Sequence, residues 1–205
     1  MDKAERTLSR VDPIMRRLIT RHGPCTLKRH KDAFLLLCIA IISQQISNKA
    51  AVSITKRWKA LYQERPTPAK VFATDDERLR GAGVSPQKQR YLKDLARHFV
   101  EKKIKPATFD ALSDEEIITE LVAVKGIGRW TAEMFLIFSL ARPDVFAFDD
   151  LGLRKTVERL YNKGRPLSRE RLISISDKWR PYRSVASWYL WASVDAKTKK
   201  EEKVW

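Results

Sequence analysis

The chain has 205 residues, of which 41 are Lys or Arg and 25 are Asp or Glu, so its formal net charge is +16 at pH 7. Hydrophobic residues make up 43% of the chain. This content excludes a disordered polymer, because such chains lack the apolar residues to form a core. The cationic excess indicates a polyanionic partner, and nucleic acid is favoured over a merely soluble or ribosome-like basic protein.

The chain has two cysteines, Cys25 and Cys38. They cannot supply the about four thiolates that an iron–sulfur cluster requires. Cys38 lies in an apolar run and is expected to be a small core residue. So few cysteines favour a reducing, cytosolic compartment over a disulfide framework. We expect no signal peptide, and the apolar run of residues 33–42 is shorter than the ~20 residues of a membrane span, so no membrane association is expected.

The first part of the chain predicts helices. Residues 1–21 form a basic helical pattern in which Pro13 suits a first helical turn. A break follows at residues 22–25. Residues 33–62 predict one or two largely buried helices, because their apolar side chains cover more than one face. The polar patch Ser43-Gln-Gln-Ile-Ser47 interrupts this run. Its glutamines either cap or bend a helix or form a surface that faces DNA.

Most later helices are marked by a residue that can cap the first turn. Five helices are predicted in this way. They run from the capping pair Thr74 and Glu77 to Arg80, from Ser85 and Pro86 to Val100, from the capping pair Ser113 and Glu116 to Val124, from Ser168 to Trp179, and from Pro181 to Val194. No segment alternates apolar and polar residues as a strand does, so the predicted class is all-α. The tail of residues 197–205 is charged and is expected to be mobile.

A glycine hairpin separates the helix that ends near Val124 from an apolar helix over residues 130–140. Gly126 and Gly128 permit a positive φ and a close approach of the backbone to a neighbour. The N–H groups and the helix dipole at the start of the second helix favour an anion, and Lys125 and Arg129 add positive charge. The alternative is that the hairpin needs its glycines for geometry alone.

An acidic pair, Asp149 and Asp150, follows the apolar helix after a short loop that ends at Phe148. One of the two aspartates is expected to cap a helix that runs to residue 161. The N-terminus of that helix would stabilise an ionised carboxylate. The alternative is that both aspartates only cap the helix.

Taken in this order, the motifs resemble the helix-hairpin-helix superfamily of DNA glycosylases, and within it the alkylation-repair, 3-methyladenine DNA glycosylase II-like branch. The resemblance covers residues 12–195. The motifs that carry it are Leu121-Val-Ala-Val-Lys-Gly-Ile-Gly-Arg-Trp-Thr-Ala132, the pair Asp149-Asp150, Ile41-Ile-Ser-Gln-Gln-Ile-Ser47, Trp179-Arg-Pro-Tyr-Arg-Ser184 and Tyr189-Leu-Trp191. It implies one compact unit of two helical lobes, 30–140 and 1–29 plus 141–205, with the hairpin at the rim of a cleft and Asp150 within it.

The resemblance implies a monofunctional glycosylase of base excision repair. It would flip out alkylated purines of the 3-methyladenine and 7-methylguanine type and hydrolyse their N-glycosidic bonds. The partner would be double-stranded DNA that contains alkylated bases, and the protein a monomer in the cytoplasm at the nucleoid, or in a nucleus. The superfamily places an apolar residue three positions after the catalytic aspartate. Counting from Asp150 reaches Leu153, and counting from Asp149 reaches Gly152, so Asp150 is the predicted catalytic residue.

The remaining site residues also follow from the resemblance. Members that cut the DNA backbone carry a lysine where this chain has Trp130, so no lyase activity is expected. The implied residues are Trp130, Met134 and Trp191 in the base pocket, Lys125, Gly126, Gly128, Arg129 and Thr131 at the DNA backbone, and Gln45, with Ile46 or Gln44 as alternatives, as the wedge beside the orphaned base. Arg183 is a candidate phosphate contact, whereas Trp179, Trp188 and Tyr182 are expected to be structural.

No cofactor and no metal centre are expected, although some relatives carry an iron–sulfur cluster. The hairpin carbonyls are a candidate site for a structural monovalent cation, as in relatives. Two other functions stay open. One is a non-catalytic helix-hairpin-helix protein that binds DNA, and the other is a glycosylase for oxidised bases with lyase activity.

Overall fold

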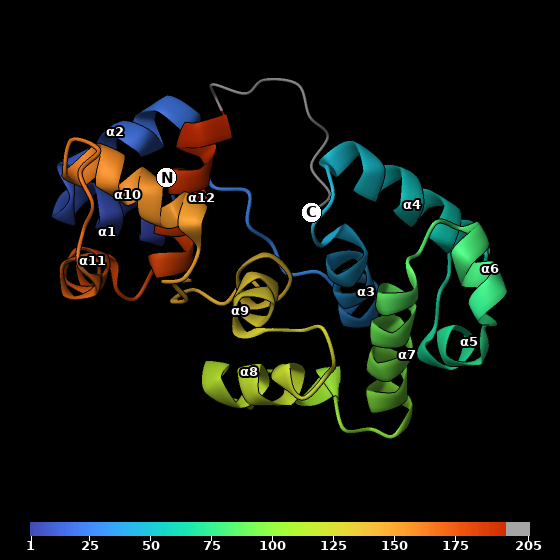
Figure 1. The fold of residues 1–205 in the computed structure, drawn as a ribbon. Helices are drawn as coiled ribbons and strands as arrows, with labels where there is room; N and C mark the ends of the chain where they lie inside the picture. Colours follow the sequence, from blue (N-terminus) through green and yellow to red (C-terminus); the bar gives the residue numbers. More distant parts are fainter. Residues whose placement is uncertain (196–205) are drawn as a thin grey trace. The chain divides into compact units, whose positions relative to one another are not determined.

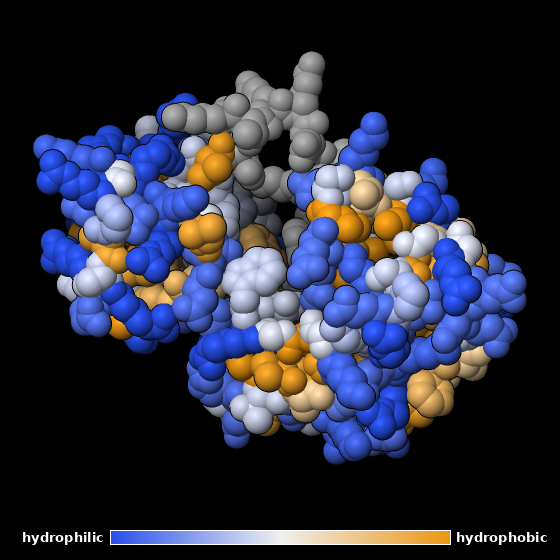
Figure 2. Space-filling model, in the orientation of Figure 1, coloured by the Kyte–Doolittle hydropathy of each residue, from blue (hydrophilic) through white to orange (hydrophobic). Residues whose placement is uncertain are grey.

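The computed structural model describes residues 1–195, which are helical and contain no strand (Figure 1). The predicted all-α class is confirmed. The tail of residues 197–205 lies outside the described residues. None of the helices described is both long and apolar enough to cross a bilayer. The surface seen in Figure 2 is mostly hydrophilic with separate apolar patches, which fits the chain's high content of charged residues.

The chain divides into two compact units. The central unit comprises residues 30–135. Its elements are α3 (Ala33–Ser43), α4 (Asn48–Ala60), α5 (Pro68–Ala73), α6 (Asp76–Gly81), α7 (Pro86–Val100), η1 (Pro106–Thr108), α8 (Asp114–Val122) and the first part of α9 (Arg129–Phe138). Helix α7 packs against α3, α5 and α6. It is therefore the helix around which the rest of this unit is arranged.

The terminal unit comprises residues 1–29 and, within the described chain, 136–195. Its elements are α1 (Lys3–Val11), α2 (Pro13–His22), the end of α9, α10 (Leu151–Tyr161), α11 (Arg169–Ser176), η2 (Asp177–Trp179) and α12 (Arg183–Asp195). Helix α12 packs against α1, α2 and α10. The two ends of the described chain thus share one core.

Several predicted helix starts are confirmed by the caps that the structure shows. Ser85 caps α7, and Ser113 with Glu116 forms the capping box of α8. Ser168 caps α11. These starts depend only on neighbours in sequence, which is why the local pattern predicts them.

The predicted capping box of Thr74 with Glu77 is wrong. Asp75 precedes α6 and makes no side-chain capping bond. The Oγ1 of Thr74 instead donates to the carbonyl of Lys70 at 2.7 Å and accepts from the hydroxyl of Tyr62 at 3.0 Å. The physical reason is α5, a helix that was not predicted, because its last turn takes up the threonine hydroxyl.

Two other boundaries differ from the prediction. The pattern over residues 1–21 is two helices, because Asp12 ends α1 and its Oδ1 accepts from the N–H groups of Ile14 and Met15 at the start of α2. Helix α12 begins at Arg183, two residues after the predicted start at Pro181.

Asp12 also links three elements of the terminal unit. Its side chain is nearly buried, with 4% of the residue exposed. Oδ2 accepts from the hydroxyl of Tyr161 on α10 at 2.7 Å and from the indole N–H of Trp179 in η2 at 2.9 Å. Burial, and then the hydrogen bond to Asp12, raise the pKa of Tyr161 far above its usual range, so the hydroxyl stays a donor. This carboxylate therefore satisfies the buried indole N–H of Trp179 and the partly buried hydroxyl of Tyr161.

We expect Asp12→Ala to lower the free energy of unfolding by about 3–5 kcal/mol, because it removes a helix cap and takes away the acceptor of the Trp179 and Tyr161 donors. Urea denaturation followed by circular dichroism measures this change. The control is Asp76→Asn on α6, whose exposed carboxylate pairs with Lys93. That variant should keep the wild-type midpoint. Equal midpoints for all three proteins would contradict the role of Asp12.

Candidate active site and nucleic-acid interface

The glycine hairpin between α8 and α9 lies directly against α7. Gly126 has φ +84°, and a Cβ at this position would lie 2.1 Å from Cδ2 of Tyr91. Only glycine fits there. Gly128 differs, because its φ is outside the left-handed region and nothing lies within 4 Å of its Cβ position. Gly128 therefore leaves open space beside the backbone at the start of α9, where a ligand could approach closely.

The hairpin is fixed to α7 by a buried carboxylate as well as by the tyrosine ring. The N–H of Lys125 donates to Oδ2 of Asp94 at 2.9 Å, and the guanidinium of Arg97 donates to Oδ1. Burial raises the pKa of Asp94, but the hydrogen bonds from Lys125 and Arg97 outweigh it and bring the pKa below its ordinary value. The carboxylate is thus ionised at neutral pH and holds the backbone of the hairpin in place.

The two cations that flank the hairpin have different surroundings. The Lys125 side chain is exposed. The guanidinium of Arg129 binds both carboxylate oxygens of Glu115 on α8, and its Nε lies 3.1 Å from Oε1 of Glu133. Thr131, the other predicted backbone contact, is buried with 7% of the residue exposed. Among the described residues, the structure shows carboxylates bound to the side chain of Arg129 and none bound to that of Lys125.

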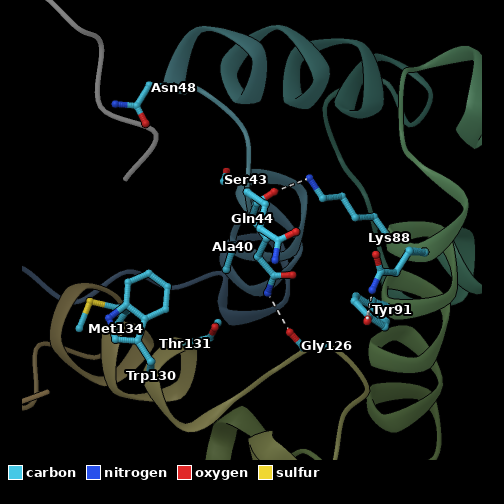
Figure 3. A pocket seen from close by; sticks show the side chains of 12 residues that line it. Ala40, Ser43, Gln44, Asn48, Lys88, Tyr91, Gly126, Trp130, Thr131 and Met134 are labelled. Atoms are coloured by element: carbon cyan, nitrogen blue, oxygen red, sulfur yellow. Dashed lines mark hydrogen bonds between the residues drawn. The ribbon is translucent and has the colours of Figure 1, made fainter. Parts of the chain in front are cut away.

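A cavity of about 530 Å³ opens in the central unit beside the hairpin (Figure 3). It is lined by Ala40, Ser43, Gln44, Gln45, Asn48, Gln87, Lys88, Tyr91, Gly126, Trp130, Thr131 and Met134. Trp130 is 45% exposed, whereas Met134 is buried. The structure thus brings two predicted base-pocket residues, Trp130 and Met134, to the same cavity as the predicted wedge residues Gln44 and Gln45.

The residues after α3 form a turn, residues 44–47, which we call the wedge turn. Gln45 is exposed and has φ +56°, a left-handed backbone that costs a residue other than glycine about 1–2 kcal/mol. Ile46 is half-buried. The amide of Gln44 donates to the carbonyl of Gly126 at 2.8 Å. Gln44 therefore bridges the wedge turn to the hairpin, and Gln45 is the residue at the exposed tip.

In the terminal unit, Asp150 is the N-cap of α10. Its Oδ1 accepts from the N–H of Leu153 at 2.6 Å, and 8% of the residue is exposed. A Cβ on Gly152 would lie 3.1 Å from Oδ1 of Asp150 and 3.9 Å from Nε1 of Trp191. The carboxylate and the indole nitrogen therefore both lie close to the same glycine. The ring of Trp191 also packs against Phe138 at a centroid distance of 5.1 Å.

The residues three positions after each of the two aspartates agree with Asp150 as the inward-facing one. Leu153, three residues after Asp150, is fully buried, whereas Gly152, three residues after Asp149, is exposed. Asp149 itself is exposed, and its Oδ1 lies 2.9 Å from Nη1 of Arg169. Asp150 is thus the buried, oriented carboxylate, and the capping role that the sequence left open between the two belongs to it.

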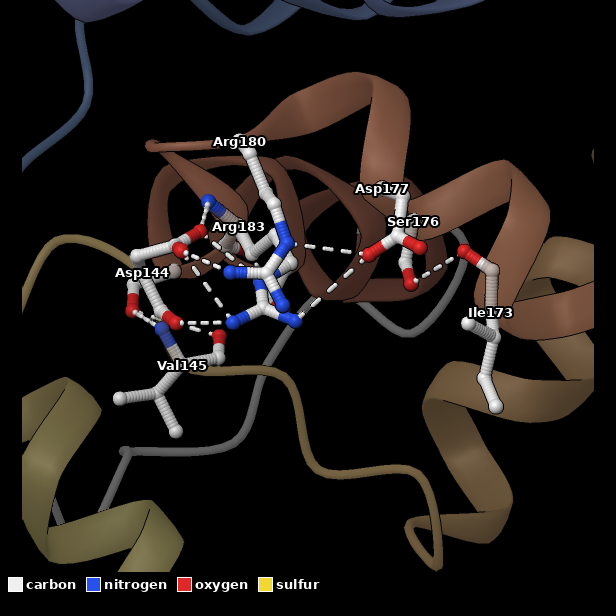
Figure 4. Close-up of polar contacts among 9 residues, drawn as sticks. Asp144, Val145, Ile173, Ser176, Asp177, Arg180 and Arg183 are labelled. Atoms are coloured by element: carbon white, nitrogen blue, oxygen red, sulfur yellow. Dashed lines mark hydrogen bonds and ion pairs between the residues drawn. The ribbon is translucent and has the colours of Figure 1, made fainter. Parts of the chain in front are cut away.

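The loop that leads to Asp150 is fixed by contacts from the start of α12 (Figure 4). Nε of Arg183 donates to Oδ1 of Asp144 at 2.8 Å, and Nη2 donates to the Asp144 carbonyl at 2.7 Å. The hydroxyl of Ser184 accepts from the N–H of Val145 at 2.9 Å. The side chain of Arg183 is only 13% exposed. The structure therefore shows Arg183 bound to this loop, whereas the sequence suggested a phosphate contact for it.

The sequence interpretation placed this loop but missed the contacts that hold it, and it also missed Lys88, Tyr91 and Asp94, although it predicted α7 correctly. No local pattern marks these residues, because their partners lie 31–46 positions away in the chain. Trp179 is fully buried, and the ring of Trp188 packs edge to face on that of Tyr189.

The described residues contain no group of three or more His, Cys, Asp or Glu side chains that could hold a metal ion. Burial raises the pKa of the Cys25 thiol to about 11 and that of the Cys38 thiol well above its usual range. Both thiols are therefore protonated at neutral pH and are poor ligands in this state.

The helical fold, the hairpin and the capping aspartate define a class of protein. Residues 38–181 match the family described as HhH-GPD superfamily base excision DNA repair protein. The chain belongs to this family.

Individual relatives are similar over nearly the whole chain. DNA-3-methyladenine glycosylase 1 of Schizosaccharomyces pombe is 37% identical over 198 residues, which are 93% of this chain and 86% of the relative. A DNA-3-methyladenine glycosidase structure from Bacillus halodurans has a TM-score of 0.87 at 31% identity, with 99% of this chain and 94% of the other covered. The structure of the S. pombe 3-methyladenine DNA glycosylase Mag1 in complex with abasic DNA has a TM-score of 0.84 at 34% identity, with 98% and 100% covered.

We expect Gly126→Ala to lower the free energy of unfolding by about 2 kcal/mol or more, because it adds left-handed strain and a clash with the Tyr91 ring. Gly128→Ala is the matched control and should cost under about 1 kcal/mol, since its Cβ enters open space. Denaturant titration of both variants measures the difference. Similar losses in the two would show that the packing of Tyr91 on the hairpin does not constrain position 126.

Proposed function

We propose that this chain is a monofunctional DNA glycosylase that hydrolyses the N-glycosidic bond of alkylated purines, of the 3-methyladenine and 7-methylguanine type, in duplex DNA. The family membership and the names of relatives that cover most of the chain support this activity. The observation that carries the proposal within the structure is the oriented carboxylate of Asp150 beside Trp191.

Asp150 has the properties that this reaction requires. As the glycosidic bond breaks, positive charge develops on the sugar, and a nearby carboxylate stabilises it and orients the attacking water. The N–H of Leu153 fixes Oδ1, so the carboxylate does not have to reorganise during the reaction. Its low exposure also strengthens the attraction, because screening by water is weaker at a buried site.

The leaving group explains why one carboxylate is sufficient. A purine alkylated at N3 or N7 already carries positive charge and leaves without a strong general acid. Indole rings attract such a cation by about 1–2 kcal/mol when the pair is desolvated. Trp130, which is partly exposed and lines the same cavity as the buried Met134, suits this stacking in the central unit. We propose that Trp191 also contacts the base, because its indole nitrogen lies near the carboxylate of Asp150 in the terminal unit.

The hairpin residues suit a grip on the DNA backbone. The exposed Lys125, the open space at Gly128 and the N-terminus of α9 at Arg129 and Thr131 favour a phosphate. The Mag1 structure with abasic DNA supports DNA as the partner. For the wedge we propose Gln45, with Ile46 beside it, because Gln44 is already bound to the hairpin.

We propose that the reaction needs no cofactor, since the carboxylate and water carry out the chemistry described, and that the protein acts as a monomer. The carbonyls of the hairpin stay a candidate site for a structural monovalent cation, and the carbonyl of Gly126 among them accepts from the Gln44 amide.

We expect Asp150→Asn to reduce base release from methylated duplex DNA by about 100- to 1000-fold while duplex binding is retained, because the charge is lost but the amide still caps α10. Single-turnover measurement of released base, with a parallel binding titration, checks this. The control is Asp149→Asn, which should keep activity.

The alternatives predict other results in this experiment. If the wild-type protein binds duplex but releases no base, the chain is a non-catalytic DNA-binding member of the family. If Asp150→Asn is as active as wild type, another group carries the reaction.

We also expect no covalent adduct when the protein is treated with borohydride in the presence of lesion DNA, because Trp130 cannot form the Schiff base that a lysine would. The measurement is a gel of the protein–DNA mixture, with a bifunctional glycosylase as the positive control. Trapping of the wild-type protein on an oxidised-base substrate would favour the alternative of an oxidised-base glycosylase with lyase activity.

A further inference from the structure

Three residues on one stripe of α7, Lys88, Tyr91 and Asp94, contact the two segments that the proposed function assigns to DNA. Their spacing of three places them next to one another along the helix surface. Tyr91 lies against the hairpin at Gly126, and Asp94 accepts from the N–H of Lys125. Lys88 contacts the other segment, the wedge turn.

The Lys88 ammonium binds carbonyl groups at the C-terminal end of α3 (Figure 3). Its Nζ donates to the carbonyl of Ile42 at 2.6 Å and to that of Gln44 at 2.8 Å. The last carbonyls of a helix lack intrahelical partners and carry the negative end of the helix dipole, so a cation is favoured there. Hydrogen bonds with a charged donor are also stronger than neutral ones.

The wedge turn depends on this contact for its shape. Gln45 holds a left-handed backbone conformation directly after the carbonyl that Lys88 binds. Such a conformation persists in a residue other than glycine only where its surroundings enforce it. The Gln44 side chain then ties the same turn to the carbonyl of Gly126. Lys88 and Gln44 together therefore set the position of Gln45 relative to the hairpin within the central unit.

We propose that Lys88 is a positioning residue for base extrusion, acting through the wedge turn. The inference rests on the proposed function. Lys88 fixes the backbone on either side of Ser43 so that Gln45 enters the duplex at a set distance from the hairpin that grips the strand. Partial burial lowers the pKa of Lys88, which agrees with an ammonium held against the two carbonyls.

The test compares two duplexes that carry a single 7-methylguanine, opposite either cytosine or an abasic analogue. The second lesion is unpaired, so its extrusion needs less help from a wedge. We expect Lys88→Met to slow single-turnover excision of the paired lesion by about tenfold or more, and that of the unpaired lesion by less than about threefold. Lys88→Arg should recover most of the rate on the paired lesion, since a guanidinium keeps the positive charge and has N–H donors for both carbonyls.

The matched control is Lys93→Met, a lysine on the same helix that pairs with Asp76 away from the wedge turn. It should leave both rates unchanged. Equal slowing of both substrates by Lys88→Met, together with a lower thermal midpoint, would mean that Lys88 only stabilises the fold. Unchanged rates on both would overturn the proposal as well.

A second measurement separates this inference from the proposed function. A 2-aminopurine placed opposite an abasic analogue reports by its fluorescence whether the wedge displaces the orphaned base, and it requires no excision. We expect Lys88→Met to reduce the signal at saturating protein, and Lys93→Met to match wild type. If wild type excises neither lesion, the glycosylase proposal fails. A signal from Lys88→Met equal to wild type overturns the positioning role in either case.

Discussion

The peptide at Gly126 is the constraint on which the candidate DNA interface depends. Its Cα faces the Tyr91 ring with no room for another carbon atom, and its carbonyl accepts from Gln44. The adjacent N–H, of Lys125, donates to Asp94. Three segments far apart in the sequence therefore meet on one residue without a side chain. Each contact joins a side chain of α7 or of the wedge turn to the backbone of the hairpin, so three separate side chains hold the hairpin in position.

In the terminal unit, local and distant contacts together orient the carboxylate of Asp150. The N-cap of α10 fixes Asp150 from the C-terminal side, through Leu153. Arg183 and Ser184 fix the loop on its N-terminal side, through Asp144 and Val145. A reacting group held from both sides needs little reorganisation when charge develops beside it, which is the condition for strong electrostatic catalysis. Asp150 is thus placed on a rigid element, and not on a flexible loop.

The features that the sequence could predict are those encoded by near neighbours. The caps at Ser85, Ser113 and Ser168, the glycine break and the all-helical class follow from local residue preferences. Features that depend on distant partners could not be predicted. Arg183 lies 39 positions from the aspartate that binds it.

The site shows the same division between local and distant signals. The motif order led to the correct family, and the register of Leu153 distinguished Asp150 from its neighbour. The roles of the site residues in base recognition, and the arrangement of the two lobes around a cleft, stay predictions. Lys88 carried no signal in the sequence, since a lysine on an amphipathic helix is ordinarily a solvated residue.

The carboxylates around Arg129 have a consequence for how such a protein would move along DNA. Glu115 and Glu133 balance the guanidinium, so the hairpin presents less net charge than its sequence suggests. Each phosphate contact made by a cation slows dissociation from any sequence alike, because the backbone is the same everywhere. In the proposed glycosylase, a hairpin with one unbalanced lysine would hold each phosphate less strongly than a hairpin with two unbalanced cations. The pairing of Arg129 would then favour passage along intact DNA over tight binding at any one position.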